Sequence, residues 1–144
     1  MIIKRVTQYE DELYTSVLTL LPQLDSTIEP PSQEFFKELL GSGNIYFFVA
    51  EDEPGEIAGM LTLVSYPNLT GRKLWIEDVV VDASCRGKGV GEKLTMAAIE
   101  FARTLGSKEV KLTSRPSREA ANRLYLETGF VRYETNVYKY DLNH

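Results

Sequence analysis

A strand-like run that leads into a glycine-rich loop, at residues 75–91, constrains this chain more than any other feature. The strand ends in β-branched residues and the loop holds glycine at every other position: Val79, Val80, Val81, Gly87, Gly89 and Gly91. Because glycine has no Cβ, such a loop can turn tightly and expose its amides. Apolar residues then recur at helical spacing: Val90, Leu94, Ala97, Ala98, Phe101, Ala102 and Leu105. The stretch therefore predicts a strand, a loop and a helix whose N-terminus attracts phosphate oxygens.

The loop alone leaves two interpretations open, phosphate binding and simple strand-to-helix geometry. Two common phosphate loops are excluded by the residues present. A dinucleotide fingerprint requires glycine where Glu92 stands, and a P-loop requires a Gly-Lys-Ser/Thr sequence that is absent.

Two motifs together resemble a known family. The stretch Arg86-Gly87-Lys88-Gly89-Val90-Gly91 fits the pattern R/Q-x-x-G-x-G/A, and it resembles the acyl-coenzyme A loop of the GNAT superfamily of N-acetyltransferases. Residues 120–130 are similar to the second signature of the superfamily, in which an asparagine three residues before a tyrosine is followed by Gly-Phe. These residues are Asn122 and Tyr125 here. Two departures are Ala83, where many members have proline, and Cys85, where an aromatic residue is common.

The resemblance covers nearly all of the chain, although residues 1–72 match only in the order of their elements. It implies an α/β fold of the GNAT type, with a mixed, mostly antiparallel sheet and helices on both faces. The sheet is expected to splay between strands at residues 74–82 and 109–114. We predict a single N-acetyltransferase domain over residues 1–144.

The resemblance also implies an acetyl-coenzyme A site in that splay. The pantetheine arm is expected along the strand, the pyrophosphate on the loop amides, and the thiol end near the last helix. The cofactor-binding residues expected from this are Val79, Val80, Val81, Arg86, Gly87, Lys88, Gly89, Val90, Gly91, Asn122 and Tyr125.

The expected chemistry is direct attack of a primary amine on the thioester through a tetrahedral intermediate. A carboxylate must take the proton of the amine, and Glu77 and Asp78 are the candidates. Because side chains alternate along a strand, the two should point to opposite faces unless a bulge intervenes, and the pattern does not choose between them. The resemblance implies a carboxylate in this region, acting directly or through water, and we take Glu77 as the first candidate. An N–H near Val79 or Val80 can stabilise the oxyanion.

Tyr125 resembles the general acid of the family. A phenol is a weaker acid than a thiol, so full proton transfer to a thiolate would be uphill by about 2 kcal/mol. Hydrogen bonding to the leaving sulfur is therefore the role expected. A non-catalytic acyl-coenzyme A sensor of the same fold is the alternative function, although such a binder would need only the loop.

Charge and composition limit the partners. The chain has 144 residues and a formal net charge of −5, which argues against nucleic-acid or membrane surfaces as partners. We expect a cytoplasmic protein, because one cysteine forms no internal disulfide and the N-terminus shows no signal core. His144 is the only histidine, so no metal site of the usual kind is expected. The acceptor is expected to be a primary amine of a small molecule, peptide or protein, and the acidic residues Glu10, Asp11, Glu12 and Glu34 favour a cationic one. The architecture is also compatible with a homodimer.

The remaining elements follow from periodicity. Strands are predicted at residues 2–6, 45–51, 56–66, 74–82, 109–114, 130–134 and 137–142, and helices at 13–24, 32–40, 90–105 and 117–127. Pro22 should end or bend the first helix. Ser32 and Ser117 are the expected N-caps of the second and fourth helices.

Overall fold

The structure is a computed structural model that describes residues 1–143. Its contacts divide the chain into two compact units, residues 1–113 and the residues from Ser114 onward. The single domain expected over residues 1–144 stays a prediction.

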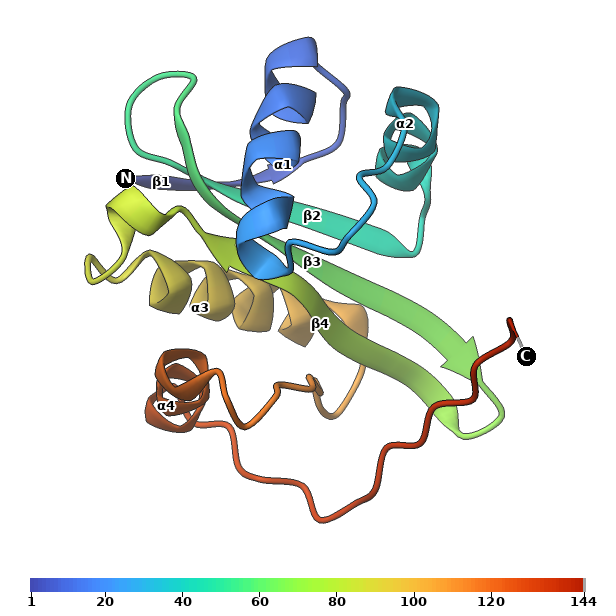
Figure 1. The fold of residues 1–144 in the computed structure, drawn as a ribbon. Helices are drawn as coiled ribbons and strands as arrows, with labels where there is room; N and C mark the ends of the chain where they lie inside the picture. Colours follow the sequence, from blue (N-terminus) through green and yellow to red (C-terminus); the bar gives the residue numbers. More distant parts are fainter. Residues whose placement is uncertain (144) are drawn as a thin grey trace. The chain divides into compact units, whose positions relative to one another are not determined.

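A four-stranded antiparallel sheet forms the centre of the first unit (Figure 1). Its strands lie in chain order: β1 (Ile2–Val6), β2 (Ile45–Glu51), β3 (Ile57–Asn68) and β4 (Gly71–Val81). The hairpin of β3 and β4 is longer than expected, because Pro67 and Asn68 continue the ladder down to the Asn68–Gly71 pair. Proline is tolerated near a strand end, where its missing N–H costs little.

Helices cover both faces of this sheet (Figure 1). On one face, α1 (Asp11–Leu24) and α2 (Gln33–Gly41) bury Leu20 and Phe36 against Met60 and Val80 of the sheet. On the other face lies α3 (Val90–Ala102). A Cβ added to Gly59 would meet the Leu94 side chain of α3 at 3.1 Å, so this glycine allows close helix–sheet packing.

The predicted helix ends are mostly confirmed. The Ser32 hydroxyl accepts a hydrogen bond from the Phe35 N–H at 3.1 Å, which caps α2. Pro22 lies inside the last turn of α1, which ends at Leu24 without a break at the proline. Two short 3₁₀ turns, η1 (Ala83–Cys85) and η2 (Arg103–Leu105), flank α3. Among residues 1–143, no helix is long and apolar enough to cross a membrane.

The strand predicted at residues 109–114 is wrong in its extent. A single parallel bridge joins Lys111 to Trp75. It has two backbone hydrogen bonds, from Ile76 N–H to Lys111 O at 2.9 Å and from Lys111 N–H to Leu74 O at 3.0 Å. The parallel direction is the one that a helical crossover between the two segments allows. The alternation of Val110 and Leu112 indicates side-chain burial, which does not by itself require a continuous ladder.

The second unit contains α4 (Glu119–Glu127) and an extended segment after it. Its N-cap is Arg118, without a side-chain bond, so the prediction of Ser117 as the cap is wrong by one residue. The strands predicted at residues 130–134 and 137–142 are also wrong, because neither segment forms a ladder within the described chain. Apolar alternation predicts a strand only where a partner strand supplies the hydrogen bonds.

Candidate active site

A β-bulge interrupts β4 at the position of the candidate carboxylates. The register shifts between Met60 and Thr62, whose partners on β4 are Val80 and Glu77. Between these pairs, β4 therefore has one residue more than β3, which defines a bulge. Asp78 lies in it with φ at +53°, the left-handed region, and is the only non-glycine residue of the described chain with positive φ. Aspartate enters this region more readily than most residues, so its presence here fits the bulge.

The bulge brings the two carboxylates onto one face of the sheet. Glu77 lies opposite Thr62, and cross-strand partners share a face. The Asp78 carboxyl group is hydrogen-bonded to the Thr62 side chain, which is buried. Glu77 and Asp78 therefore do not point to opposite faces, because the extra residue breaks the alternation; this bulge is the exception that the sequence analysis allowed. This face is also the one covered by α1 and α2, since Met60 of the same β3 face packs against them.

Both carboxyl groups hold protons more tightly than usual. Partial desolvation raises the pKa of Glu77, and the negative charge of Asp78 raises it further. Desolvation also raises the pKa of Asp78, while the hydrogen bond from Thr62 partly offsets this. Both side chains keep surface accessible to solvent. Each can therefore exchange a proton with a ligand, and raised pKa values favour a general base near neutral pH.

The bulge also decides which backbone groups face the free edge of β4. Before it, the Ile76 N–H points away from β3, into the bridge described above. After it, the Asp82 N–H donates to Ala58 O on β3 at 2.8 Å. Because backbone groups alternate sides along a strand, the outward positions after the bulge are Val79 and Val81. Within residues 1–113, no bridge occupies this part of the edge.

Val80 lies between these two positions, and its backbone N–H and C=O point toward β3 rather than toward the free edge of β4. It pairs with Met60, and its side chain is buried. Its N–H therefore belongs to the β3–β4 ladder, which leaves the N–H of Val79 as the donor that can meet a ligand. The sequence pattern alone leaves Val79 and Val80 equivalent.

The glycine loop after β4 exposes backbone N–H groups at the start of α3. Gly87 and Gly89 have φ of +80° and +78°, which residues with a Cβ adopt only with strain. Gly89 is the N-cap of α3 and makes no side-chain cap bond. The first N–H groups of the helix are thus open, and the exposed cations Arg86 and Lys88 flank them. Open amides, a helix dipole and local positive charge fit a pyrophosphate group.

The start of this loop is held by Gln23, a residue that sequence analysis missed. Its Nε2 donates to Asp82 Oδ1 at 2.8 Å, and its Oε1 accepts from the Ala83 N–H at 2.8 Å. Asp82 also accepts hydrogen bonds from the N–H and hydroxyl of Ser84. These bonds, with that of Gln23 the largest, lower the pKa of Asp82. No local pattern marks Gln23, because its partners are about 60 residues away in the chain.

In the second unit, Asn122 and Tyr125 have well-defined surroundings. The amide Nδ2 of Asn122 donates to Arg115 O and Arg118 O, each at 2.9 Å. Both of its donors are therefore used, and only its carbonyl oxygen is left to accept a bond from a ligand. Tyr125 is buried, and its ring contacts Phe130 edge-on at 5.7 Å between centroids. Burial raises the pKa of the Tyr125 phenol, which keeps it protonated as a donor.

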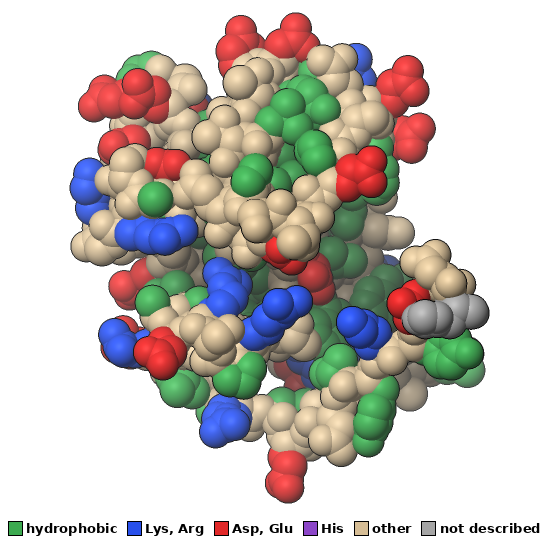
Figure 2. All heavy atoms as spheres, in the orientation of Figure 1, with side chains coloured by type: hydrophobic (Ala, Val, Ile, Leu, Met, Phe, Trp, Pro, Cys, Tyr) green, Lys and Arg blue, Asp and Glu red, His purple; other side chains and the backbone are tan. Residues whose placement is uncertain are grey.

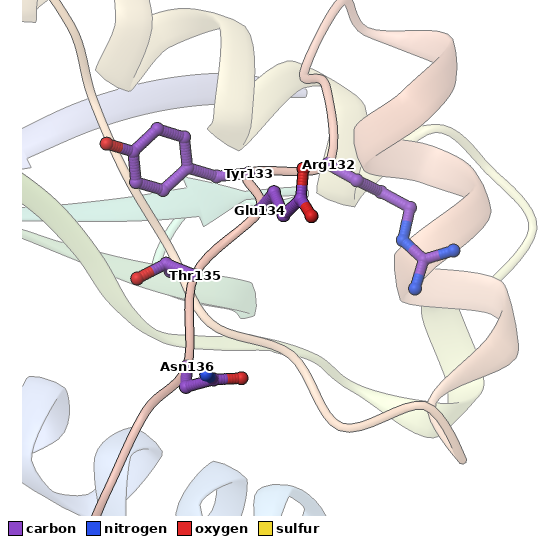
Figure 3. Close-up of a pocket in the computed structure, with 5 residues that line it drawn as sticks. All are labelled: Arg132, Tyr133, Glu134, Thr135 and Asn136. Atoms are coloured by element: carbon purple, nitrogen blue, oxygen red, sulfur yellow. The ribbon is translucent and has the colours of Figure 1, made fainter.

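A cavity of about 580 Å³ also lies in the second unit, along residues 132–136 (Figure 3). The side chains of Arg132 and Tyr133 point in opposite directions from the chain, so they do not converge on one ligand. None of the expected site residues lines this cavity. We assign it no role in catalysis.

The comparison with known families decides the identity of this arrangement. The Acetyltransferase (GNAT) family matches residues 10–130, which include the bulge, the loop and α4. This chain belongs to the GNAT family. The protein is therefore an N-acetyltransferase, and the family uses acetyl-coenzyme A as its acyl donor.

Several relatives of this N-acetyltransferase are similar over most of their length. Glucosamine 6-phosphate N-acetyltransferase 1 of Oryza sativa subsp. japonica is 32% identical over 83% of this chain and 74% of its own. N-alpha-acetyltransferase 30 of Schizosaccharomyces pombe is 28% identical over 80% of this chain and 76% of its own length. An aminoglycoside acetyltransferase, meta-AAC0020, from an uncultured soil metagenomic sample has a structure with a TM-score of 0.86, at 25% identity over 97% of this chain and 94% of that one. The names of these relatives include a sugar phosphate and aminoglycosides, so they do not define one acceptor.

Proposed function

We propose that this enzyme transfers an acetyl group from acetyl-coenzyme A to a cationic primary amine by direct attack. The observation that carries the proposal is the bulge at Asp78. It gathers Glu77 and Asp78 on one face of β4 and turns Val79 and Val81 toward the free edge of the same strand. A base and a strand edge that can pair with the donor then lie within a few residues of each other.

The binding of acetyl-coenzyme A is supported by two features of the first unit. The outward backbone groups of Val79 and Val81 can pair with an amide-bearing arm in the manner of an added strand. The amides of Gly87, Gly89 and the start of α3 can hold the pyrophosphate. When bound, acetyl-coenzyme A supplies an acetyl group activated as a thioester.

The carboxylates supply the base. An alkyl ammonium ion with a pKa of roughly 10 is mostly protonated at neutral pH, so the enzyme must remove a proton before attack. We propose Glu77 as the first acceptor, because it lies on regular strand next to the bulge and the negative charge of Asp78 raises its pKa. Asp78 then acts as an electrostatic partner held by Thr62. The N–H of Val79 is the donor proposed for the thioester oxygen.

The phenol of Tyr125 is proposed as the hydrogen-bond donor to the leaving sulfur. Its raised pKa supports donation and argues against its use as a base. Asn122 is proposed to accept a hydrogen bond from the donor arm through its carbonyl oxygen, because its two N–H groups are already engaged.

The choice of a cationic acceptor comes from charge. Figure 2 shows Asp and Glu side chains gathered over the ends of α1 and α2. The first turns of these helices contain Asp11, Glu12 and Glu34. Because α1 and α2 cover the same sheet face that carries Glu77, an approaching ammonium ion meets negative charge on this side.

Release of coenzyme A tests the proposal. The enzyme is supplied with acetyl-coenzyme A and a set of primary amines, among them spermidine, glucosamine, an aminoglycoside and a peptide with a free N-terminus, and thiol release is measured. We expect amine-dependent release that Glu77→Gln lowers by about 100-fold, in the range of general-base effects. Glu53→Gln, in the exposed turn between β2 and β3, is the matched control and should be unchanged. Saturable acetyl-coenzyme A binding without release for any amine would instead favour the sensor function.

A further inference from the structure

A second cavity of the first unit lies at the start of β4, away from the glycine loop. It has a volume of about 360 Å³ and is lined by residues 70–75 and by the segment after α3. β4 has 11 residues, so at about 3.3 Å per residue the strand is roughly 35 Å long. The cavity is at one end of this strand and the glycine loop at the other. A ligand in the cavity is therefore separate from the pyrophosphate site.

The two walls of the cavity are joined by hydrogen bonds. The bridge between Trp75 and Lys111 ties the segment after α3 to β4. The Ser107 hydroxyl lies 3.1 Å from Arg72 O and 3.2 Å from Glu109 O, which are both acceptors. The walls are thus set before any ligand binds, which lowers the entropic cost of binding.

The lining is basic although the whole chain is acidic. It holds Arg72, Lys73, Lys108 and Lys111 against one carboxylate, Glu109, for a net charge of +3. The chain as a whole carries −5. Glu109 pairs with Lys111 at 3.5 Å, and neither Lys73 nor Lys108 forms an ion pair within residues 1–143. Positive charge therefore concentrates in a concave site, where it attracts anions.

One of these cations is held in place by a buried hydroxyl. Arg72 Nη1 donates to Ser65 Oγ at 2.7 Å, and Ser65 is only 1% exposed. Arg72 shares the sheet face of Ser65 and Leu74, whereas Lys73 and Trp75 lie on the opposite face of β4, so the lysines rather than Arg72 are the receptor proposed for phosphate oxygens.

Trp75 adds an apolar surface to the same lining. Its indole Nε1 donates to the Tyr66 hydroxyl at 3.2 Å, so its one polar atom already has a partner. What the indole can offer a ligand is the face of its ring, which stacks on flat organic groups and covers apolar ones.

We propose that this cavity binds a phosphorylated small molecule, with its phosphate on Lys73 and Lys108 and its organic part against Trp75. The volume lies at the small end of ligand pockets, which suits a mononucleotide or a sugar phosphate. A phosphate monoester carries a charge of about −1.5 to −2 at neutral pH, which the lining charge of +3 exceeds. The site does not depend on the proposed acetyl transfer.

The intrinsic fluorescence of the protein tests this proposal directly, because Trp75 is the only tryptophan in the chain. The full chain is titrated with AMP, glucose 6-phosphate and inorganic phosphate at constant ionic strength. Adenosine and glucose are the matched ligands without phosphate. We expect saturable fluorescence changes with a phosphate ester, weaker binding of inorganic phosphate, and no saturable change with adenosine or glucose. Equal binding of adenosine and AMP would overturn the phosphate assignment, and a short single-stranded oligonucleotide that binds more tightly than either ester would overturn the small-molecule class.

Two variants with opposite expected effects complete the test. The double substitution Lys73→Gln and Lys108→Gln should weaken the ester about tenfold, because two charge-assisted contacts are lost. Glu109→Gln should strengthen it about threefold, because the only carboxylate of the lining becomes neutral. A control with Lys4→Gln and Lys37→Gln, on β1 and α2 of the same unit and outside the lining, removes the same total charge and should bind as the unaltered protein does. Equal weakening in the control, or weakening by Glu109→Gln, would show that bulk charge rather than this cavity binds the ligand.

Discussion

Replacing Gln23 with leucine should loosen the start of the glycine loop without changing any residue of the loop itself. The Gln23 side chain makes two hydrogen bonds of 2.8 Å, one to the Asp82 carboxylate and one from the Ala83 N–H. A neutral hydrogen bond contributes about 0.5–1.5 kcal/mol to the free energy of unfolding, and one to a charged group about 1.5–3 kcal/mol. Both bonds lie near the surface, so the lower value of each of these two energy ranges applies. The expected loss is about 2 kcal/mol of folding stability.

Part of that loss should appear in the binding of acetyl-coenzyme A. A loop that is no longer held must be ordered when the pyrophosphate binds, and about 1 kcal/mol of ordering cost corresponds to a roughly fivefold increase in Kd. Isothermal titration with acetyl-coenzyme A measures Kd, and urea unfolding measures stability. The turnover number at saturating donor should change little, because Gln23 touches no reacting group.

The pH dependence of stability separates the hydrogen bond from simple packing. The bond from Gln23 lowers the pKa of Asp82, so its contribution is complete above the unfolded pKa of about 4 and is lost as the pH falls through the lowered folded value. The stability difference between the Gln23→Leu variant and the unaltered protein should therefore shrink below pH 4. Gln23→Glu keeps an acceptor for the Ala83 N–H but sets a second carboxylate against Asp82, so it should be worse than leucine at neutral pH and recover in acid.

Gln8→Leu is the matched control, because Gln8 is exposed and lies outside the helices and strands. It should leave both stability and Kd unchanged. A Gln23→Leu variant with lower stability but an unchanged Kd for acetyl-coenzyme A would refute the positioning role. A difference in stability that persists unchanged below pH 4 would show that packing, and not the bond to Asp82, is what Gln23 contributes.

The remaining predictions concern the proposed active site. Tyr125→Phe should lower turnover by about tenfold or more and leave the Kd for acetyl-coenzyme A nearly unchanged, since it removes only a donor to the leaving sulfur. Steady-state kinetics measures the turnover number and titration measures the Kd. An unchanged turnover number would remove Tyr125 from this role. Gly89→Val should abolish detectable binding of acetyl-coenzyme A, because valine is strained at a φ of +78°, whereas Gly43→Val, at an exposed glycine without positive φ, should bind normally in a thermal-shift titration. Thr62→Val removes the hydrogen bond that lowers the pKa of Asp78, so this pKa should rise. Asp78 then keeps its proton to a higher pH and raises the pKa of Glu77 less, so the acidic limb of the rate–pH profile, which reports Glu77 as the base, should move to lower pH; a shift toward higher pH, or none, would contradict the contact.

Local patterns in the sequence predict the elements of the first unit well. The antiparallel meander of β2, β3 and β4, the helix after the loop and the cap at Ser32 all follow from spacing and from residue type. Hydrophobic periodicity and glycine conformation are properties of neighbouring residues, so they can be read from the chain. The same reasoning fails where a strand needs a distant partner, as at residues 109–114 and 130–142, because alternation of apolar residues does not supply the hydrogen bonds of a ladder.

By itself, the sequence determines the family motifs, the positive-φ glycines of the loop and the presence of two adjacent acidic residues on β4. Only the tertiary structure decides how those acidic residues are used. The register of β3 against β4 contains one extra residue at Asp78, and this places Glu77 and Asp78 together beside Thr62 and turns Val79 toward the open edge. The register depends on the pairing of two strands, and the hydrogen bonds of Gln23 to Asp82 and Ala83 depend on contacts between distant segments. Neither can therefore be predicted from a local sequence pattern.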